Sequence, residues 1–174
     1  KQTKRWDVKM QIGESFVGEG VNAAHINTVY GHRDGPAGVA WATALATPSQ
    51  GHVPYMAVVK PSVPAKPVTL FVTKAAPGSD THGIMIWGPA QAGVAAGVMD
   101  AVAAGALDEK SLDQHCIIAA VWVNPAADDA DLVYKNNRES MKQALINGSK
   151  GLPLLEEVIQ AAKSPSNPFY SAKD

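Results

Sequence analysis

A few polar side chains interrupt an otherwise small and apolar sequence, and they could do chemistry. His25 and Asn27 stand in the run Ala23–Asn27. Side chains two residues apart in a strand share a face, which would place these two about 6.6 Å apart along it. Histidine titrates nearest to neutral pH, a property that suits it to general acid or base catalysis. His25 is therefore the first candidate for a catalytic group.

Two more positions could assist it. Lys74 ends an apolar, strand-like segment, and Gln91 follows Gly88-Pro89-Ala90 at the start of a helical pattern. A lysine supplies a positive donor, and a glutamine amide can both donate and accept. Taken alone, all three candidates also fit structural roles: a strand histidine, a solvated strand end and a helix cap.

A resident metal ion or a nucleophilic side chain is not expected. The five histidines, at positions 25, 32, 52, 82 and 115, form no i, i+2 or i, i+4 pair that would place two imidazoles on one face of an element. The one cysteine, Cys116, lies inside a predicted strand, where a buried, inert thiol is the usual outcome. It allows neither an intrachain disulfide nor a cysteine-based zinc cluster. The serine motif GxSxG is also absent.

Two further motifs are interpreted as structural. Gly18-Glu19-Gly20 begins a loose match to the dinucleotide-binding fingerprint, but a strand-like segment follows where a helix is required. We therefore expect a hairpin turn there. Asp128, Asp129 and Asp131 fall in the first turn of a predicted helix, where carboxylates complement the helix dipole.

Composition limits the class of protein. The chain has 174 residues, of which 46% are hydrophobic and only 6% aromatic, so we expect close packing of small and branched side chains. Fifteen basic against sixteen acidic residues give a net charge of −1, which removes the usual electrostatic basis for nucleic-acid binding. No apolar run approaches the roughly 20 residues of a membrane-spanning helix, so no membrane partner is expected.

Hydrophobic periodicity and turn residues predict the strands and helices that position the candidate residues. We expect a polar N-terminal arm over residues 1–9 and a single domain over residues 10–174. The mixture of strand pairs and helices predicts an α+β fold with one mixed β-sheet covered by helices. The expected strands are 8–17 and 21–30, paired as a hairpin, and 55–59, 68–74, 84–87 and 115–123. The expected helices are 36–46, 89–104, 127–147, which Gly148 would end, and 152–163. A proline-rich loop is expected at 61–67 and a turn at 78–83.

These motifs, in this order, resemble the formaldehyde-activating enzyme family over roughly residues 10–170. The resemblance is most specific in the strand Ala24-His25-Ile26 and in the block Gly88-Pro89-Ala90-Gln91 followed by Gly93-Val94-Ala95. Supporting matches are Ile12-Gly13-Glu14, Val17 to Gly20, Lys66-Pro67, Thr69-Leu70, Lys74, Ala126 to Ala130 and Asn167-Pro168-Phe169.

The resemblance implies a fold related to domain 2 of ribosomal protein S5, and a cytoplasmic homopentamer with active sites between subunits. It implies condensation of formaldehyde with tetrahydromethanopterin as co-substrate, with loss of water and without a prosthetic group or metal. His25 matches the family's catalytic histidine, which would act as general acid. The matches to the family's substrate-binding positions are Asn27, Met56, Lys74, Ala76 and Gln91.

Three positions depart from the family pattern. Asn27 stands where the family has an aspartate, Ala76 where it has a threonine, and Ala92 where a histidine follows the glutamine. Each change removes a polar or ionisable group from the expected site. Two alternatives to the enzyme are therefore kept: a non-enzymatic binder or sensor of formaldehyde or of a pterin one-carbon carrier, and a related activity on another amine cofactor.

Overall fold

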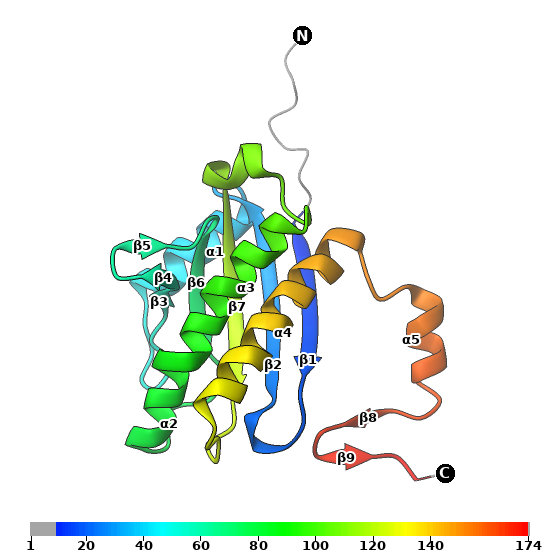
Figure 1. Cartoon of the computed structure of the whole chain (residues 1–174). Coiled ribbons are helices and arrows are strands. Elements are labelled where there is room, and N and C mark those ends of the chain that lie inside the picture. Colours follow the sequence, from blue (N-terminus) through cyan, green and yellow to red (C-terminus); the bar gives the residue numbers. More distant parts are fainter. Residues whose placement is uncertain (1–9, 174) are drawn as a thin grey trace.

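A five-stranded mixed sheet forms the centre of the molecule (Figure 1). The structure is a computed structural model that describes residues 10–173, so the predicted arm at residues 1–9 lies outside the described residues. The strand order is β1-β2-β7-β6-β3, in which β6 and β7 run parallel and the other neighbours are antiparallel. The sheet strands are β1 (Gln11–Val17), β2 (Ala24–His32), β3 (Tyr55–Met56), β6 (Val68–Thr73) and β7 (His115–Val123).

Helices cover both faces of the sheet. In Figure 1, α3 and α4 cross the near face and α1 lies behind. The α+β class with one main mixed sheet is thus confirmed. The helices are α1 (Pro36–Ala46), α2 (Asp80–Met85), α3 (Gln91–Ala103), α4 (Ala130–Lys150) and α5 (Leu155–Ala161); the short turns are η1 (Gly20–Asn22), η2 (Ile86–Ala90) and η3 (Glu109–Gln114). Among residues 10–173, no helix combines the length and the apolar character needed to cross a membrane.

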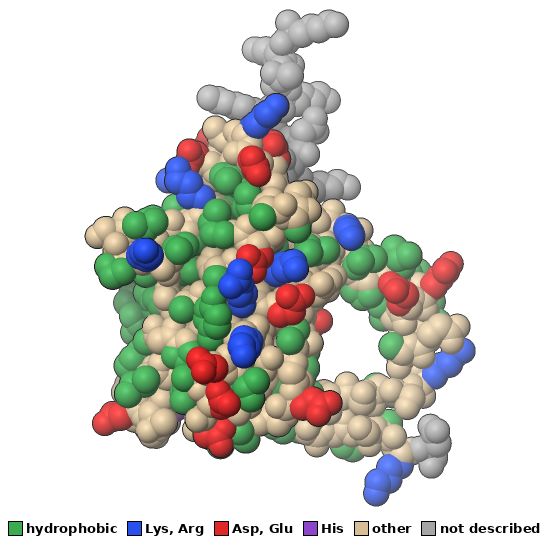
Figure 2. All heavy atoms as spheres, viewed as in Figure 1, with side chains coloured by type: hydrophobic (Ala, Val, Ile, Leu, Met, Phe, Trp, Pro, Cys, Tyr) green, Lys and Arg blue, Asp and Glu red, His purple; other side chains and the backbone are tan. Residues whose placement is uncertain are grey.

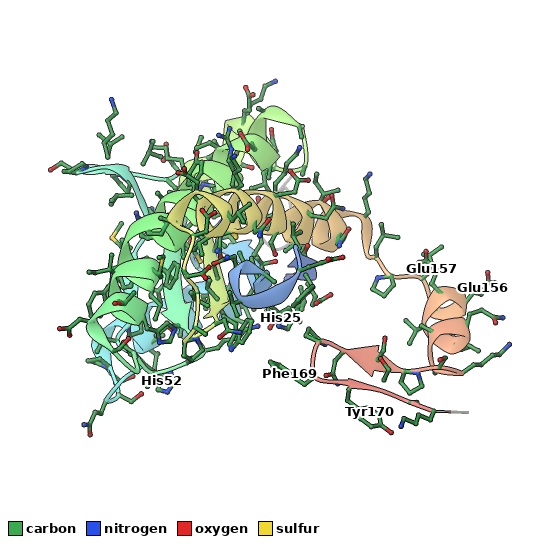
Figure 3. The ribbon with its side chains drawn as sticks, turned by 60° about the horizontal axis from the view of Figure 1, so that its bottom comes forward. His25, His52, Glu156, Glu157, Phe169 and Tyr170 are labelled. Atoms are coloured by element: carbon green, nitrogen blue, oxygen red, sulfur yellow. The ribbon has the colours of Figure 1, made fainter. Side chains whose placement is uncertain are left out.

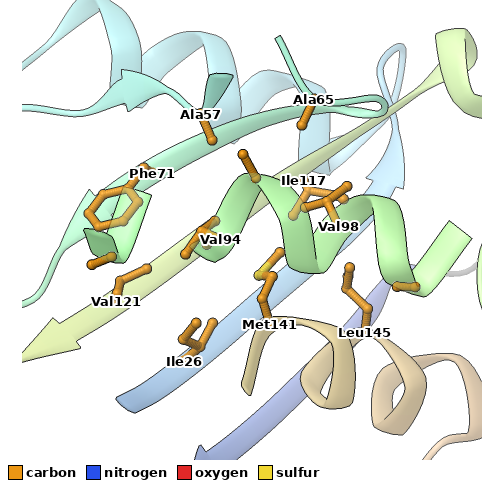
Figure 4. Packing of buried hydrophobic residues seen from close by; sticks show 14 of the residues in the cluster. Ile26, Ala57, Ala65, Phe71, Val94, Val98, Ile117, Val121, Met141 and Leu145 are labelled. Carbon is orange, nitrogen blue, oxygen red and sulfur yellow. The ribbon is translucent and has the colours of Figure 1, made fainter. Parts of the chain in front are cut away.

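The core lies between the sheet and the α3–α4 layer (Figure 4). Val94 and Val98 of α3 and Met141 of α4 are fully buried there. Glycine permits the close approach of the two helices, because a Cβ at Gly93 would lie 2.5 Å from the Tyr134 carbonyl oxygen. The small-residue helix predicted from the sequence therefore packs as expected, against a second helix as well as the sheet.

The strand predicted at 84–87 is wrong. These residues continue α2 into the π-type turn η2, which leads directly into α3. Ser79 caps α2 by accepting a hydrogen bond from the His82 amide, so a helix begins inside the segment predicted as a turn. A short apolar run is ambiguous between a buried strand and a buried helix, and here the cap decides the outcome.

Other boundaries differ for local reasons. The strand predicted at 55–59 is divided at Ala57 into β3 and β4 (Val58–Lys60), and β4 pairs with β5 (Val63–Pro64) inside the predicted loop. Helix α4 passes Gly148 and ends at Lys150, and the next residue, Gly151, caps it with φ 64°. The last helix starts only after Pro153, where the Glu157 carboxylate accepts a hydrogen bond from the Leu154 amide.

The C-terminal residues form an arm that stands away from the body. After α4 the chain runs outward through α5 and turns back in a small hairpin, β8 (Ser166–Asn167) and β9 (Tyr170–Ser171). Figure 2 shows an open gap between this arm and the body. It also shows charged side chains of both signs on the face formed by α3 and α4. We call residues 152–173 the C-terminal arm.

Candidate active site

The candidate residues gather where β6 and β7 end and β2 begins. Ile26 of β2 is fully buried in the core, so its neighbours His25 and Asn27 project from the opposite face of the sheet. Lys74 directly follows β6, and Trp122 lies near the end of β7. Since β2 is antiparallel to β7 and β7 is parallel to β6, all three strands bring these side chains to the same edge.

His25 lies between the Glu14 carboxylate and the Lys74 ammonium. Its Nε2 lies 2.8 Å from Oε1 of Glu14 on β1, and its Nδ1 lies 3.3 Å from Nζ of Lys74. A lysine ammonium can only donate, so Nδ1 accepts that hydrogen bond, and the Nε2–H of the resulting tautomer donates to the Glu14 carboxylate. Each ring nitrogen of His25 is therefore hydrogen-bonded to an ionisable side chain.

Lys74 also connects the two residues of β2. Its Nζ donates a hydrogen bond to Oδ1 of Asn27 as well as contacting His25. Burial lowers the pKa of the Lys74 ammonium from its ordinary value, and the negative charge of Glu14 partly opposes that shift. The site thus holds a lysine whose proton is easier to release than that of an exposed lysine.

A cavity of about 1130 Å³ opens beside these groups. It is large enough for a drug-sized ligand, and its wall combines aromatic faces with a few polar groups, as small-molecule sites usually do. Its lining residues come from six parts of the chain: Glu14 and Phe16 from β1; Gly18, Glu19, Gly20 and Val21 from the β1–β2 loop; His25 and Asn27 from β2; Lys74 after β6; Trp122 and Asn124 at the end of β7; and Ser166, Asn167, Pro168 and Phe169 from the C-terminal arm.

The β1–β2 loop is fixed by helix α4. The Oδ1 of Asn22 accepts hydrogen bonds from the Asp128 and Asp129 amides, 3.0 and 3.1 Å away, and Asn136 donates to the Asn22 carbonyl. Gly18 has φ +88°, a conformation that favours glycine. The sequence Gly18-Glu19-Gly20 therefore begins a hairpin loop, as predicted, and this loop is one wall of the cavity.

The structure separates the other predicted substrate-binding residues from His25. Met56 pairs with Leu70 of β6. Leu70 lies four residues before Lys74, which is about 13 Å along the strand. Ala76 is exposed in the turn after β6. Gln91 lies in the helix layer, where its Oε1 accepts a 2.5 Å hydrogen bond from the Val58 amide. None of the three lines the cavity.

Sequence reasoning did not select Glu14, Trp122 or Phe169 as candidate site residues, although all three line the cavity. Strand alternation and the hairpin could have indicated Glu14, because the register pairs Glu14 with Asn27 and Phe16 with His25. Phe169 gives no such local signal, since it reaches the site from the far end of the chain. Within residues 10–173, no cluster of three histidine, cysteine or carboxylate side chains could hold a metal ion.

Comparisons with known proteins show what the whole chain is similar to. The model of the family described as formaldehyde-activating enzyme matches residues 12–170. The chain is 40% identical over 162 residues to the 5,6,7,8-tetrahydromethanopterin hydro-lyase of Methanosarcina barkeri, which covers 93% of this chain and 91% of the relative.

Longer relatives match as well. The bifunctional enzyme Fae/Hps of Archaeoglobus fulgidus is 34% identical over 166 residues, which is 95% of this chain but 42% of the relative. The bifunctional enzyme Fae/Hps of Methanosphaerula palustris is 36% identical over 143 residues, which is 82% of this chain and 36% of the relative. The chain thus spans about two fifths of the length of these bifunctional proteins.

Proposed function

Because the chain belongs to the formaldehyde-activating enzyme family, we propose that it is a hydro-lyase-type enzyme that condenses formaldehyde with tetrahydromethanopterin and releases water. The observation that carries the proposal is the placement of His25 between Glu14 and Lys74 at the edge of an aromatic-walled cavity. We also propose that the fold is related to domain 2 of ribosomal protein S5, and that the reaction needs no prosthetic group.

The chemistry requires one well-placed acid. A pterin amine attacks formaldehyde to give a carbinolamine, whose hydroxyl must be protonated before it leaves as water. The second pterin nitrogen then attacks the iminium carbon and closes the methylene bridge. In our proposal Lys74 gives a proton to Nδ1 of His25, and the resulting imidazolium passes its Nε2 proton from the Glu14 contact to the hydroxyl. The ring returns to neutral as water leaves, a contribution typically worth about 10²–10⁴ in rate.

The neighbours of His25 support this role. Glu14 orients the ring with Nε2 protonated and stabilises the imidazolium by charge. Lys74 donates toward Nδ1 and can return a proton there, which its lowered pKa favours. Asn27, held by Lys74, presents its amide toward the cavity as a ligand-positioning group.

Met56, Ala76 and Gln91 enter the proposal through a second copy of the chain. All three lie outside the cavity that His25 lines, and Gln91 belongs to the opposite layer of the molecule. In a homopentamer with sites between subunits, a neighbouring copy would bring such residues to the cavity. Exposed apolar side chains are available for the contact, among them Val39 of α1, 66% exposed, and Leu155 of α5, 73% exposed. Sedimentation velocity would test the assembly, and a monomer at working concentration would contradict it.

Stopped-flow measurement of the condensation tests the function. We expect the wild-type chain to accelerate the reaction of formaldehyde with tetrahydromethanopterin above the spontaneous rate, and His25→Ala to lose about 10²–10⁴ of that acceleration. The matched control is His52→Ala, which removes a histidine that does not line the cavity. Equal rates for wild type and His25→Ala would contradict the proposal.

A second candidate is a non-enzymatic binder or sensor of formaldehyde or of a pterin one-carbon carrier. It is favoured by one observation, that Lys74 occupies the Asn27 oxygen that would otherwise face a ligand. Calorimetric titration separates the two functions. Tight binding of tetrahydromethanopterin without rate acceleration would support the binder, and binding with acceleration would support the enzyme.

A further inference from the structure

The C-terminal arm approaches the body beside the candidate active site. Every residue from 153 to 171 is exposed, so no buried core holds the arm in place. Its hairpin nevertheless supplies Ser166, Asn167, Pro168 and Phe169 to the lining of the cavity that contains His25. Figure 3 shows Phe169 at the end of the hairpin nearest to the body, with Tyr170 on the outer side.

Phe169 meets the body through an aromatic contact. Its ring centroid lies 5.9 Å from that of Trp122 with an interplanar angle of 88°, an edge-to-face arrangement. Phe169 remains 79% exposed in this position. A large apolar side chain left so exposed gains little from folding, so its place over the cavity calls for another partner.

Trp122 lies directly beside the catalytic candidate. The register of β2 and β7 pairs His25 with Trp122, so both side chains project from the same face. Side chains at directly paired positions have Cβ atoms about 4.5–5.5 Å apart. A flat ring lying against the indole of Trp122 would therefore have its edge within reach of His25.

The remaining walls fit a planar heterocycle with polar edges. Phe16 lies on the other side of His25, with ring centroids 6.0 Å apart. Asn124 and Glu19 line the same cavity and offer donors and acceptors to ring nitrogens and to a ring carbonyl. Aromatic faces with polar groups at the rim are what a fused, hydrogen-bonding ring system requires.

From these contacts we infer that Trp122 is the platform on which the fused ring of the amine co-substrate stacks, and that Phe169 of the C-terminal arm covers that ring. This inference rests on the proposed function, whose pterin is such a ring. In this arrangement the arm closes the cavity over the ring and keeps water from the group that His25 protonates.

Binding of 6-methyltetrahydropterin, which carries the ring without the long side chain, tests the inference. In calorimetric titration of the full chain, we expect Phe169→Ala to weaken binding about five- to fifteenfold. The matched control is Tyr170→Ala, because Tyr170 is an exposed aromatic residue on the same hairpin that does not line the cavity. We expect Tyr170→Ala to bind as the wild type does.

Trp122 is half-buried, so its variants must preserve bulk. Trp122→Phe keeps an aromatic face, and we expect it to retain most of the affinity; Trp122→Leu removes that face and should lose about tenfold. In condensation kinetics, Phe169→Ala should raise KM for tetrahydromethanopterin more than it changes kcat, which loss of fold alone would not do.

The outcomes separate this inference from the proposed function. Equal affinities for Phe169→Ala and Tyr170→Ala, or for Trp122→Leu and the wild type, would overturn the inference even if condensation is accelerated. A wild-type chain that binds the ring through Trp122 and Phe169 without accelerating condensation would uphold the inference and overturn the enzyme. A wild-type chain that binds no tetrahydropterin would overturn both.

Discussion

Glu14 reaches His25 diagonally across the β1–β2 hairpin, with 2.8 Å between Oε1 and Nε2. The family pattern places an aspartate at position 27, where this chain has asparagine, and that change suggests a histidine without a carboxylate nearby. In the structure Glu14, on the neighbouring strand, supplies a carboxylate to His25. Glu14 lies in a segment that matches the family, so the site keeps this carboxylate although Asn27 lacks the charge of the aspartate.

Replacing Glu14 by glutamine tests the importance of that charge. A hydrogen bond to a charged group is worth about 1.5–3 kcal/mol, so we expect Glu14→Gln to slow condensation about 10–100-fold. Glu109→Gln is the matched control, since Glu109 is exposed and does not line the cavity. An unchanged rate for Glu14→Gln would show that the contact has no catalytic role.

Replacing Asn27 by aspartate, the residue of the family pattern, tests whether a carboxylate at this position raises the condensation rate. Asn27→Asp would pair a carboxylate with the Lys74 ammonium, which already donates to the residue at this position. We expect a severalfold higher condensation rate, because a second negative charge favours the protonated imidazole. In the background of Lys74→Met the new carboxylate has no ammonium partner. The increase in condensation rate caused by Asn27→Asp should therefore differ from the increase in the wild-type background. A flat response to Asn27→Asp in both backgrounds would favour a re-purposed pocket.

The sequence predicted much of the sheet because local signals and tertiary structure agree there. The strand at 115–123 and the helix at 36–46 have the predicted bounds, since alternation and Pro36 determine them locally. The segment 84–87 failed because its apolar run carries no period long enough to distinguish helix from strand. Where local patterns are short, capping and packing decide the structure.

The site was predictable only in part, for a geometric reason. His25 and Asn27 share one strand, so strand alternation brings them together. Lys74 and Glu14 join them through pairings across the sheet, which a single sequence does not fix. Phe169 lies more than a hundred residues from His25 along the chain, and no local pattern could place it there.

The glycines of α3 allow a test of the packing. Gly93 lies against α4, where a Cβ would come within 2.5 Å of the Tyr134 carbonyl oxygen. Gly93→Ala should therefore lower the free energy of unfolding by about 1–3 kcal/mol, because backbone must move to admit the methyl group. At Gly88 no atom outside the chain neighbours and the helix's own backbone lies within 4 Å of the corresponding Cβ, so Gly88→Ala should not lower the free energy of unfolding. Urea denaturation measures both, and equal values for the two variants would contradict the packing argument.

The ion pair between α3 and α4 predicts a pH-dependent contribution to stability. Arg138 Nε and Nη2 lie 2.6 and 2.8 Å from the two carboxylate oxygens of Asp100. The hydrogen bonds from Arg138 lower the pKa of Asp100 from its ordinary value of 3.8. The folded state therefore binds fewer protons than the unfolded state at acidic pH, so the stabilisation is present above pH 3.8 and is lost as the pH falls through the lowered pKa.

Asp100→Asn should reveal that contribution. Both partners are partly exposed and solvent screens the pair, so we expect the variant to lose about 1 kcal/mol of unfolding free energy at pH 7. The difference from the wild type should shrink as the pH falls below 3.8 and through the lowered pKa of Asp100. Urea denaturation at pH 7, 5, 4 and 3 measures it. Asp113→Asn is the control, because the Lys66–Asp113 pair is a single, more exposed contact that should contribute less than about 0.5 kcal/mol. A difference between Asp100→Asn and wild type that stays constant down to pH 3 would show that the asparagine acts through packing of α3 against α4, and not through the charge of Asp100.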